Sequence, residues 1–125
     1  MSDRYQKGKE LLERITGFPG TSVVDGFRDI APDLIDWIVA FSYGDVISRP
    51  GLDLRTRQLA TVAALTAMAT APPQLKVHIN GALNVGCTPE EIVEVILQMT
   101  VYAGFPAVIN ALSLAREVFG ARGMK

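Results

Sequence analysis

His78, the chain's one histidine, is the first residue whose type and position could carry chemistry. On a helix it lies one turn after Gln74 and one turn before Ala82, at the edge of an apolar face. An imidazole there can act as a general acid or base, because its ordinary pKa lies near neutrality. It can also be a structural side chain bonded to a backbone carbonyl, and the pattern by itself favours that role.

A second candidate is a polar stripe in an otherwise apolar segment. Glu94, Gln98 and Tyr102 recur every four residues and would share one face of a helix. A carboxyl, an amide and a phenol on one line could form a polar pocket, and burial would suit the carboxyl to acid catalysis. The same stripe could be solvated, or could be a buried network that joins helices. These interpretations stay open at this point.

Arg57 lies early in the most hydrophobic segment of the chain, where a planar guanidinium could bind a substrate carboxylate. It could equally pair with a structural glutamate such as Glu94. Arg49, in a turn, and Arg55 are either ligands or surface charges. Cys87 has no second cysteine to pair with, and one histidine with one cysteine cannot form an ordinary zinc site.

Glycine, proline and capping residues divide the chain into six or seven helices, and no period-two alternation predicts a strand. The best-marked start is Thr88 as N-cap, followed by Pro89 and by Glu91, which completes a capping box. Cys87 and Ile92 flank this start as a hydrophobic staple. The expected helices span about residues 4–15, 23–30, 32–44, 53–70, 72–85, 88–103 and 106–120.

Composition predicts one globular domain over residues 1–125, since a hydrophobic fraction of 49% excludes a disordered chain. Twelve basic and thirteen acidic residues, with no basic block, argue against a nucleic-acid partner. The longest apolar stretch, Leu59 to Ala71, is shorter than the roughly 20 residues that cross a bilayer. Without a signal-peptide pattern or paired cysteines, a soluble cytoplasmic protein with no membrane partner is expected.

The segment from Asp53 to Thr70 is apolar on every side, which predicts a helix buried on every side. The later helices are also broadly apolar, and a domain of this size has limited interior. The surplus apolar surface predicts a homo-oligomer.

Several short runs between Tyr43 and Phe119 together resemble the carboxymuconolactone decarboxylase family. They are Gly44-Asp45-Val46, Arg49-Pro50-Gly51-Leu52, Arg57-Gln58-Leu59, Leu75-Lys76-Val77-His78, Gly86-Cys87-Thr88-Pro89-Glu90-Glu91-Ile92 and Tyr102-Ala103-Gly104-Phe105-Pro106-Ala107. The resemblance implies an all-α, AhpD-like helical bundle that assembles as a homo-oligomer, commonly a hexamer. It also implies a carbon–carbon lyase that removes CO2 from a carboxylated lactone in aromatic-compound degradation.

By the same resemblance, His78 is expected to donate the proton and Arg57 to bind a carboxylate or oxyanion. Glu94 and Tyr102 would orient the histidine or the substrate, and Arg49 and Tyr43 would line the substrate site. The reaction requires no cofactor and no metal, because the electrons left by CO2 delocalise into the unsaturated lactone carbonyl of the substrate.

The family's AhpD-like peroxidase branch carries a Cys-x-x-Cys pair before the histidine, where this chain has Ala71 and Gln74. The disulfide reductase chemistry of that branch is therefore disfavoured. The chain also departs from the dedicated pathway enzymes at Tyr43, where those have a tryptophan. A non-catalytic ligand-binding oligomer on the same fold is the third interpretation.

Overall fold

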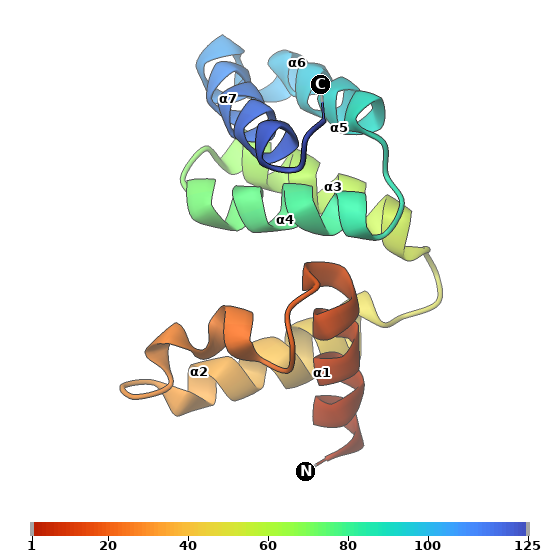
Figure 1. The fold of residues 1–125 in the computed structure, drawn as a ribbon, viewed down its shortest axis with the longest axis vertical. Helices are drawn as coiled ribbons and strands as arrows, with labels where there is room; N and C mark the ends of the chain where they lie inside the picture. Colours follow the sequence, from red (N-terminus) through yellow and green to blue (C-terminus); the bar gives the residue numbers. More distant parts are fainter. Residues whose placement is uncertain (1, 125) are drawn as a thin grey trace. The chain divides into compact units, whose positions relative to one another are not determined.

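The computed structural model describes residues 2–124, and within them the chain is all-helical and has no strand. Seven α-helices are accompanied by one 3-10 helix and one π-helix (Figure 1). The predicted all-α fold of six or seven helices is therefore confirmed over this range. The contacts form two compact units, residues 2–54 and residues 55–124. A single domain over residues 1–125 stays a prediction.

The first unit is built from four helical elements: α1 (Asp3–Thr16), η1 (Ser22–Phe27), α2 (Pro32–Trp37) and η2 (Ile38–Ile47). The Ser2 hydroxyl caps α1 by accepting a hydrogen bond from the Tyr5 N–H at 3.3 Å. Helix α1 packs along η2, and α2 packs against η1 and η2. The buried hydrophobic side chains of this unit are Leu12, Ile15, Ile35, Val39 and Tyr43.

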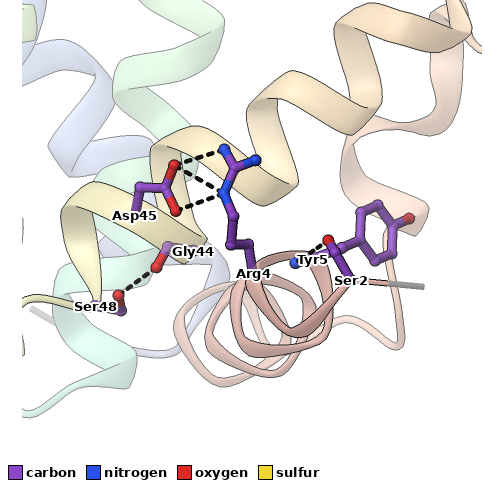
Figure 2. Close-up of polar contacts among 6 residues, drawn as sticks. All are labelled: Ser2, Arg4, Tyr5, Gly44, Asp45 and Ser48. Atoms are coloured by element: carbon purple, nitrogen blue, oxygen red, sulfur yellow. Dashed lines mark hydrogen bonds and ion pairs between the residues drawn. The ribbon is translucent and has the colours of Figure 1, made fainter.

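Two glycines let α1 and η2 approach each other closely. A Cβ atom on Gly8 would overlap the carbonyl oxygen of Val39, and a Cβ atom on Gly44 would overlap that of Arg4. Only a residue without a side chain fits at either point. Beside this crossing, the Arg4 guanidinium donates hydrogen bonds of 2.6–3.1 Å to both carboxylate oxygens of Asp45 (Figure 2).

The expected helix over residues 32–44 is in fact two elements. Helix α2 ends at Trp37 and the chain continues as the π-helix η2 to Ile47. Hydropathy does not distinguish α from π backbone bonding, so the sequence pattern does not reveal this change. Near the end of η2, the Ser48 hydroxyl donates to the Gly44 carbonyl at 2.6 Å (Figure 2).

The second unit contains the remaining helices, and α7 contacts α4, α5 and α6 within it. Their bounds are α3 (Leu54–Met68), α4 (Pro72–Asn84), α5 (Pro89–Gln98), α6 (Thr100–Ala103) and α7 (Phe105–Ala121). Figure 1 draws α5, α6 and α7 on one side of α3 and α4. The core is one cluster formed by Val62, Leu75, Ile79, Ala82, Cys87, Ile92, Ile96, Val108, Ala111, Ala115, Val118 and Phe119.

The start of α5 has the predicted geometry. The Thr88 hydroxyl accepts from the Glu91 N–H at 3.1 Å, and the Glu91 carboxylate accepts from the Thr88 N–H at 2.9 Å. Cys87 and Ile92 are both buried in the same core cluster, as a hydrophobic staple requires. Glu91 also pairs with Arg55, and this hydrogen bond is the first cause of a lowered pKa for the Glu91 carboxyl.

The expectation that the segment from Asp53 to Thr70 is buried on every side is wrong for the chain by itself. Only one stripe of α3 is buried, formed by Gln58, Val62 and Thr66, while Ala60 and Met68 are not buried. The buried stripe contains two polar residues, and apolar side chains lie on the faces outside it. None of the helices described in residues 2–124 has both the length and the apolar character needed to cross a membrane.

Candidate active site

His78 lies in the middle of α4, and its ring is held by a side chain of α3. The Nδ1 atom of His78 is 3.0 Å from the Oε1 atom of Gln58. Both helices belong to the second unit, and Gln58 is 1% exposed while His78 is partly buried. The partner of the ring is thus a side-chain amide, where the structural interpretation of the sequence expected a backbone carbonyl. The histidine therefore has a fixed ring orientation at the edge of the core.

Burial is the cause that lowers the pKa of His78 below its ordinary value of 6.5. No carboxylate or cation within the described residues contributes to that shift. A buried imidazole is harder to protonate because the charged form loses hydration. At neutral pH the ring is therefore mainly uncharged, and the imidazolium, once formed, is a stronger acid than an exposed one.

Arg57 is next to Gln58 on α3 and is partly buried, with its Nε atom beneath the surface. Its backbone carbonyl accepts a hydrogen bond of 2.9 Å from the Thr61 hydroxyl. The pairing of Arg57 with Glu94, one of the two expected roles, is not found: Glu94 forms no ion pair within residues 2–124. The pair that joins α3 to α5 is instead Arg55 with Glu91.

Glu94 lines a groove of about 570 Å³ between α5 and α7. Arg116 of α7 lines the same groove, while Val93, Leu112 and Phe119 give it apolar walls. His78 is not one of the lining residues. The described chain therefore brings His78 together with Gln58, and it places Glu94 in a separate groove.

The expected helix over residues 88–103, which would place Tyr102 on one stripe with Glu94 and Gln98, is interrupted at Met99. Helix α5 ends at Gln98 and the short α6 begins at Thr100. The Thr100 hydroxyl donates to the Leu97 carbonyl at 2.9 Å, a local side-chain bond of the kind that competes with regular helix bonding. Tyr102 is 76% exposed, and neither Glu94 nor Gln98 is buried. In the described chain the three residues do not form a buried polar pocket.

Arg49 and Tyr43 belong to the first unit. Arg49 follows η2 and lines a cleft of about 470 Å³ with Lys7, Glu10 and Arg14 of α1 and with Asp53. Tyr43 is 8% exposed in the apolar core of that unit, and burial raises the pKa of its phenol, which stays protonated at neutral pH. The roles of both residues in binding substrate stay predictions.

Cys87 is a buried member of the core cluster, with its Sγ atom 3.5 Å from the Arg55 carbonyl. Cys87 therefore lies where the predicted hydrophobic staple with Ile92 requires it. Among residues 2–124, no group of three or more His, Cys, Asp and Glu side chains has an arrangement that could hold a metal ion.

Gln58 is the site residue that the sequence patterns do not single out. It belongs to the run Arg57-Gln58-Leu59, in which only Arg57 is assigned a role from sequence. A weak signal exists: Gln58, Val62 and Thr66 follow one another at helical spacing on a segment rich in alanine and leucine. The partner of Gln58 lies twenty residues further along the chain, so only tertiary structure identifies it.

Comparison with known proteins adds independent information. Residues 32–117 match the model of the carboxymuconolactone decarboxylase family. A 4-carboxymuconolactone decarboxylase of Acinetobacter baylyi is 36% identical over 117 residues, covering 93% of this chain and 87% of the relative. An uncharacterised 15.0 kDa protein of Paracoccus denitrificans is 42% identical, over 95% of this chain and 96% of the relative. A nitrosuccinic acid decarboxylase of Metarhizium robertsii is 36% identical, over 64% of this chain and 55% of the relative.

Proposed function

The chain belongs to the carboxymuconolactone decarboxylase family, and from that premise we propose that it is a lyase that removes CO2 from a carboxylated lactone without a cofactor. Two of its relatives are named as decarboxylases of different acids, 4-carboxymuconolactone and nitrosuccinic acid. The shared reaction is the loss of CO2, so the reaction class is better supported than any one substrate. The first substrate to test is 4-carboxymuconolactone, an intermediate of aromatic-compound degradation.

The observation that carries the proposal is the environment of His78. The chain offers one imidazole, and that imidazole is held by Gln58 at the edge of a core with its pKa lowered by burial. The contact with Gln58 fixes the orientation of the ring, and a general acid must be positioned in this way to deliver a proton. The lowered pKa makes the imidazolium a stronger acid, which favours delivery of a proton to carbon after CO2 has left.

The proposed reaction uses the substrate as its own electron sink. The bond between the ring carbon and the carboxylate breaks, CO2 leaves, and the electron pair delocalises into the conjugated lactone carbonyl. His78, as imidazolium, then delivers a proton to carbon, and the neutral ring regains a proton from water. General acid catalysis of this kind contributes about 10²–10⁴-fold to a rate.

The other predicted residues have proposed roles in binding. Arg57 binds a carboxylate or the developing oxyanion, for which its planar guanidinium is suited. Arg49 binds a carboxylate from the first unit, in a cleft where Lys7 and Arg14 add positive charge and Glu10 and Asp53 offset part of it. Glu94, Tyr102 and Tyr43 orient the substrate or the histidine. Each of these roles requires the assembled protein.

A homo-oligomer, with a hexamer as the expected size, is part of the proposal. The second unit exposes a run of large apolar side chains: Leu97, Val101, Tyr102, Phe105 and Ile109. Exposed apolar groups gathered on neighbouring helices are typical of a surface that another subunit covers. Cytoplasmic location, expected from the sequence, belongs to the same proposal.

The test is an ultraviolet assay of 4-carboxymuconolactone with the wild-type protein and with His78→Ala. We expect turnover without added metal or thiol, and a loss of about 10²-fold or more in kcat for the variant. Circular dichroism must show that the variant stays folded. Cys87→Ser is the matched control, and it should retain activity.

Two outcomes would overturn the proposal. If the folded His78→Ala variant turned the lactone over at the wild-type rate, the histidine would not be the proton donor. If no carboxylated lactone were consumed and His78→Ala only weakened assembly, the chain would be a ligand-binding oligomer. Peroxide turnover that was lost in Cys87→Ser would instead favour the thiol chemistry of the peroxidase branch.

A further inference from the structure

The contact between Gln58 and His78 determines which nitrogen of the histidine is available for chemistry. The Oε1 atom of an amide can only accept a hydrogen bond, so the Nδ1 atom at 3.0 Å must carry the hydrogen. We infer that Gln58 is a positioning residue that holds His78 in the Nδ1–H tautomer, which leaves Nε2 as the atom that exchanges protons with substrate. The role of Nε2 in catalysis rests on the proposed function, whereas the tautomer does not.

The burial of Gln58 argues that its amide is retained for this contact. Gln58 is 1% exposed, and its Nε2 atom is buried without a hydrogen-bond partner among the described residues. An apolar residue of similar size would avoid that desolvation, so stability does not explain a glutamine here. What the glutamine supplies is the acceptor for His78.

The same hydrogen bond is compatible with the whole catalytic cycle. In the neutral ring, Nδ1–H donates to Gln58 and the lone pair of Nε2 is available to take up a proton from water. In the imidazolium, Nδ1–H still donates to Gln58 and the new Nε2–H is the acid. Delivery of that proton to carbon returns the ring to the neutral Nδ1–H tautomer. The orientation of His78 therefore does not change between proton uptake and release.

A glutamine at this position affects His78 differently from a carboxylate. A carboxylate beside Nδ1–H would stabilise the imidazolium and weaken it as an acid, whereas a neutral amide orients the ring without adding charge. No charged side chain of the second unit is a cause of the lowered pKa of His78. Those side chains are Arg55, Arg57, Lys76, Glu90, Glu91, Glu94, Arg116, Glu117 and Arg122. Burial is thus the cause of the lowered pKa of His78, and the contact with Gln58 determines the orientation of the ring.

The test is nitrogen NMR of the protein labelled at histidine, without substrate, because the chain has one histidine and therefore one imidazole signal set. The neutral wild-type ring should show a protonated Nδ1 and an unprotonated Nε2. Gln58→Leu, which is similar in size and apolar, should lose this preference and show a mixture of tautomers. Gln58→Glu should keep Nδ1–H and move the titration midpoint upward by about one pH unit or more.

Thr66→Val is the matched control, since Thr66 is the other buried polar residue of the α3 stripe and its hydroxyl does not contact His78. It should leave the tautomer and the titration unchanged. Thermal unfolding followed by circular dichroism verifies that each variant is folded. A wild-type ring protonated at Nε2 would overturn the inference, because Gln58 would then donate through its own Nε2. A tautomer that is unchanged in folded Gln58→Leu would overturn it as well.

Activity gives a second readout where the lactone is turned over. Gln58→Glu should shift the pH profile of kcat to higher pH, because the imidazolium persists further into the alkaline range. Gln58→Leu should lower kcat about tenfold or more and leave KM largely unchanged, which a general loss of structure would not do. If no substrate is turned over, the NMR result still decides the inference, so its failure and that of the proposed function are distinguishable.

Discussion

The two units of this protein differ in whether their buried polar groups have hydrogen-bond partners. In the first unit the buried Thr16 hydroxyl donates to the Leu12 carbonyl at 2.8 Å and accepts from the Phe18 N–H at 3.3 Å. In the second unit the buried stripe of α3 contains the Gln58 amide nitrogen and the Thr66 hydroxyl, neither of which has a hydrogen-bond partner in the described chain. A buried polar group whose hydrogen bonds are all formed is compatible with a stable fold. A buried polar group without a hydrogen-bond partner reduces stability, and such groups are concentrated where function requires them.

The units also differ in how their helices meet. Close packing in the first unit depends on glycine, since α1 and η2 touch at Gly8 and Gly44. Close packing in the second depends on a cluster of interlocking, mainly aliphatic side chains. The first unit is therefore expected to be sensitive to added atoms and the second to lost ones, and single substitutions in each unit can test this contrast.

Gly8→Ala should destabilise the first unit by about 3 kcal/mol, because the added methyl group overlaps the backbone of Val39 and neither helix can yield easily. Urea unfolding followed by the fluorescence of Trp37, the one tryptophan of the chain, measures the effect in that unit. Gly26→Ala is the control: a Cβ atom there has open space and should change stability by less than about 0.5 kcal/mol. Equal effects for the two variants would remove the glycine-based half of the comparison.

A Thr→Val substitution should change the free energy of unfolding in opposite directions in the two units. Thr16→Val removes a hydroxyl that makes two hydrogen bonds and should destabilise the fold by about 1 kcal/mol. Thr66→Val removes a buried hydroxyl with no partner in the described chain and should stabilise it by up to about 1 kcal/mol. Thermal and urea unfolding of both variants check the prediction. Destabilisation by Thr66→Val comparable to that by Thr16→Val would show that the Thr66 hydroxyl is satisfied in the folded protein.

The helix caps should also differ between the units. Thr88→Ala breaks a capping box and should destabilise the second unit by about 1 kcal/mol. Ser2→Ala removes one hydrogen bond of 3.3 Å at the start of α1 and should have a smaller effect. Hydrogen exchange of the amides in the first turns of α1 and α5 separates the two. A larger loss of protection in α1 would contradict the expected order.

The smallest expected effect is the contribution of His78 to the pH dependence of the free energy of unfolding. Its folded pKa lies below the unfolded value of about 6.5, so the unfolded chain binds more protons between these two values. The contribution of His78 to stability is therefore complete above about pH 6.5 and is lost as the pH falls towards the folded pKa. Urea unfolding between about pH 5 and pH 8 should show a steeper rise of stability with pH in the wild type than in His78→Gln. Parallel curves would mean that folding does not change the proton affinity of the histidine.

Local features of the fold are predictable from sequence because local chemistry decides them. The capping box at Thr88, the helix starts at Pro32 and Pro72 and the turn after Arg49 all lie where the residues indicate. The break at Met99 and the π geometry of η2 are not predictable, because the apolar pattern continues through both. At the break the Thr100 hydroxyl donates to the Leu97 carbonyl, and in η2 the backbone follows π-helical bonding, and neither feature has a signature in the hydropathy pattern.

For the candidate site, the residues along the chain are enough to identify the family and to predict which side chain reacts. His78 is the one imidazole available, and the runs around it assign the chain to the carboxymuconolactone decarboxylases. The partner of that histidine and the surroundings of the other candidates depend on how the helices pack. Gln58 reaches His78 from another helix, while Glu94 lies in a separate groove that His78 does not line. The physical reason is that residue type determines what chemistry is possible, whereas the tautomer and the pKa of the imidazole depend on its orientation and burial. Orientation and burial arise only when α3 and α4 pack and bring together residues that are twenty positions apart in the chain.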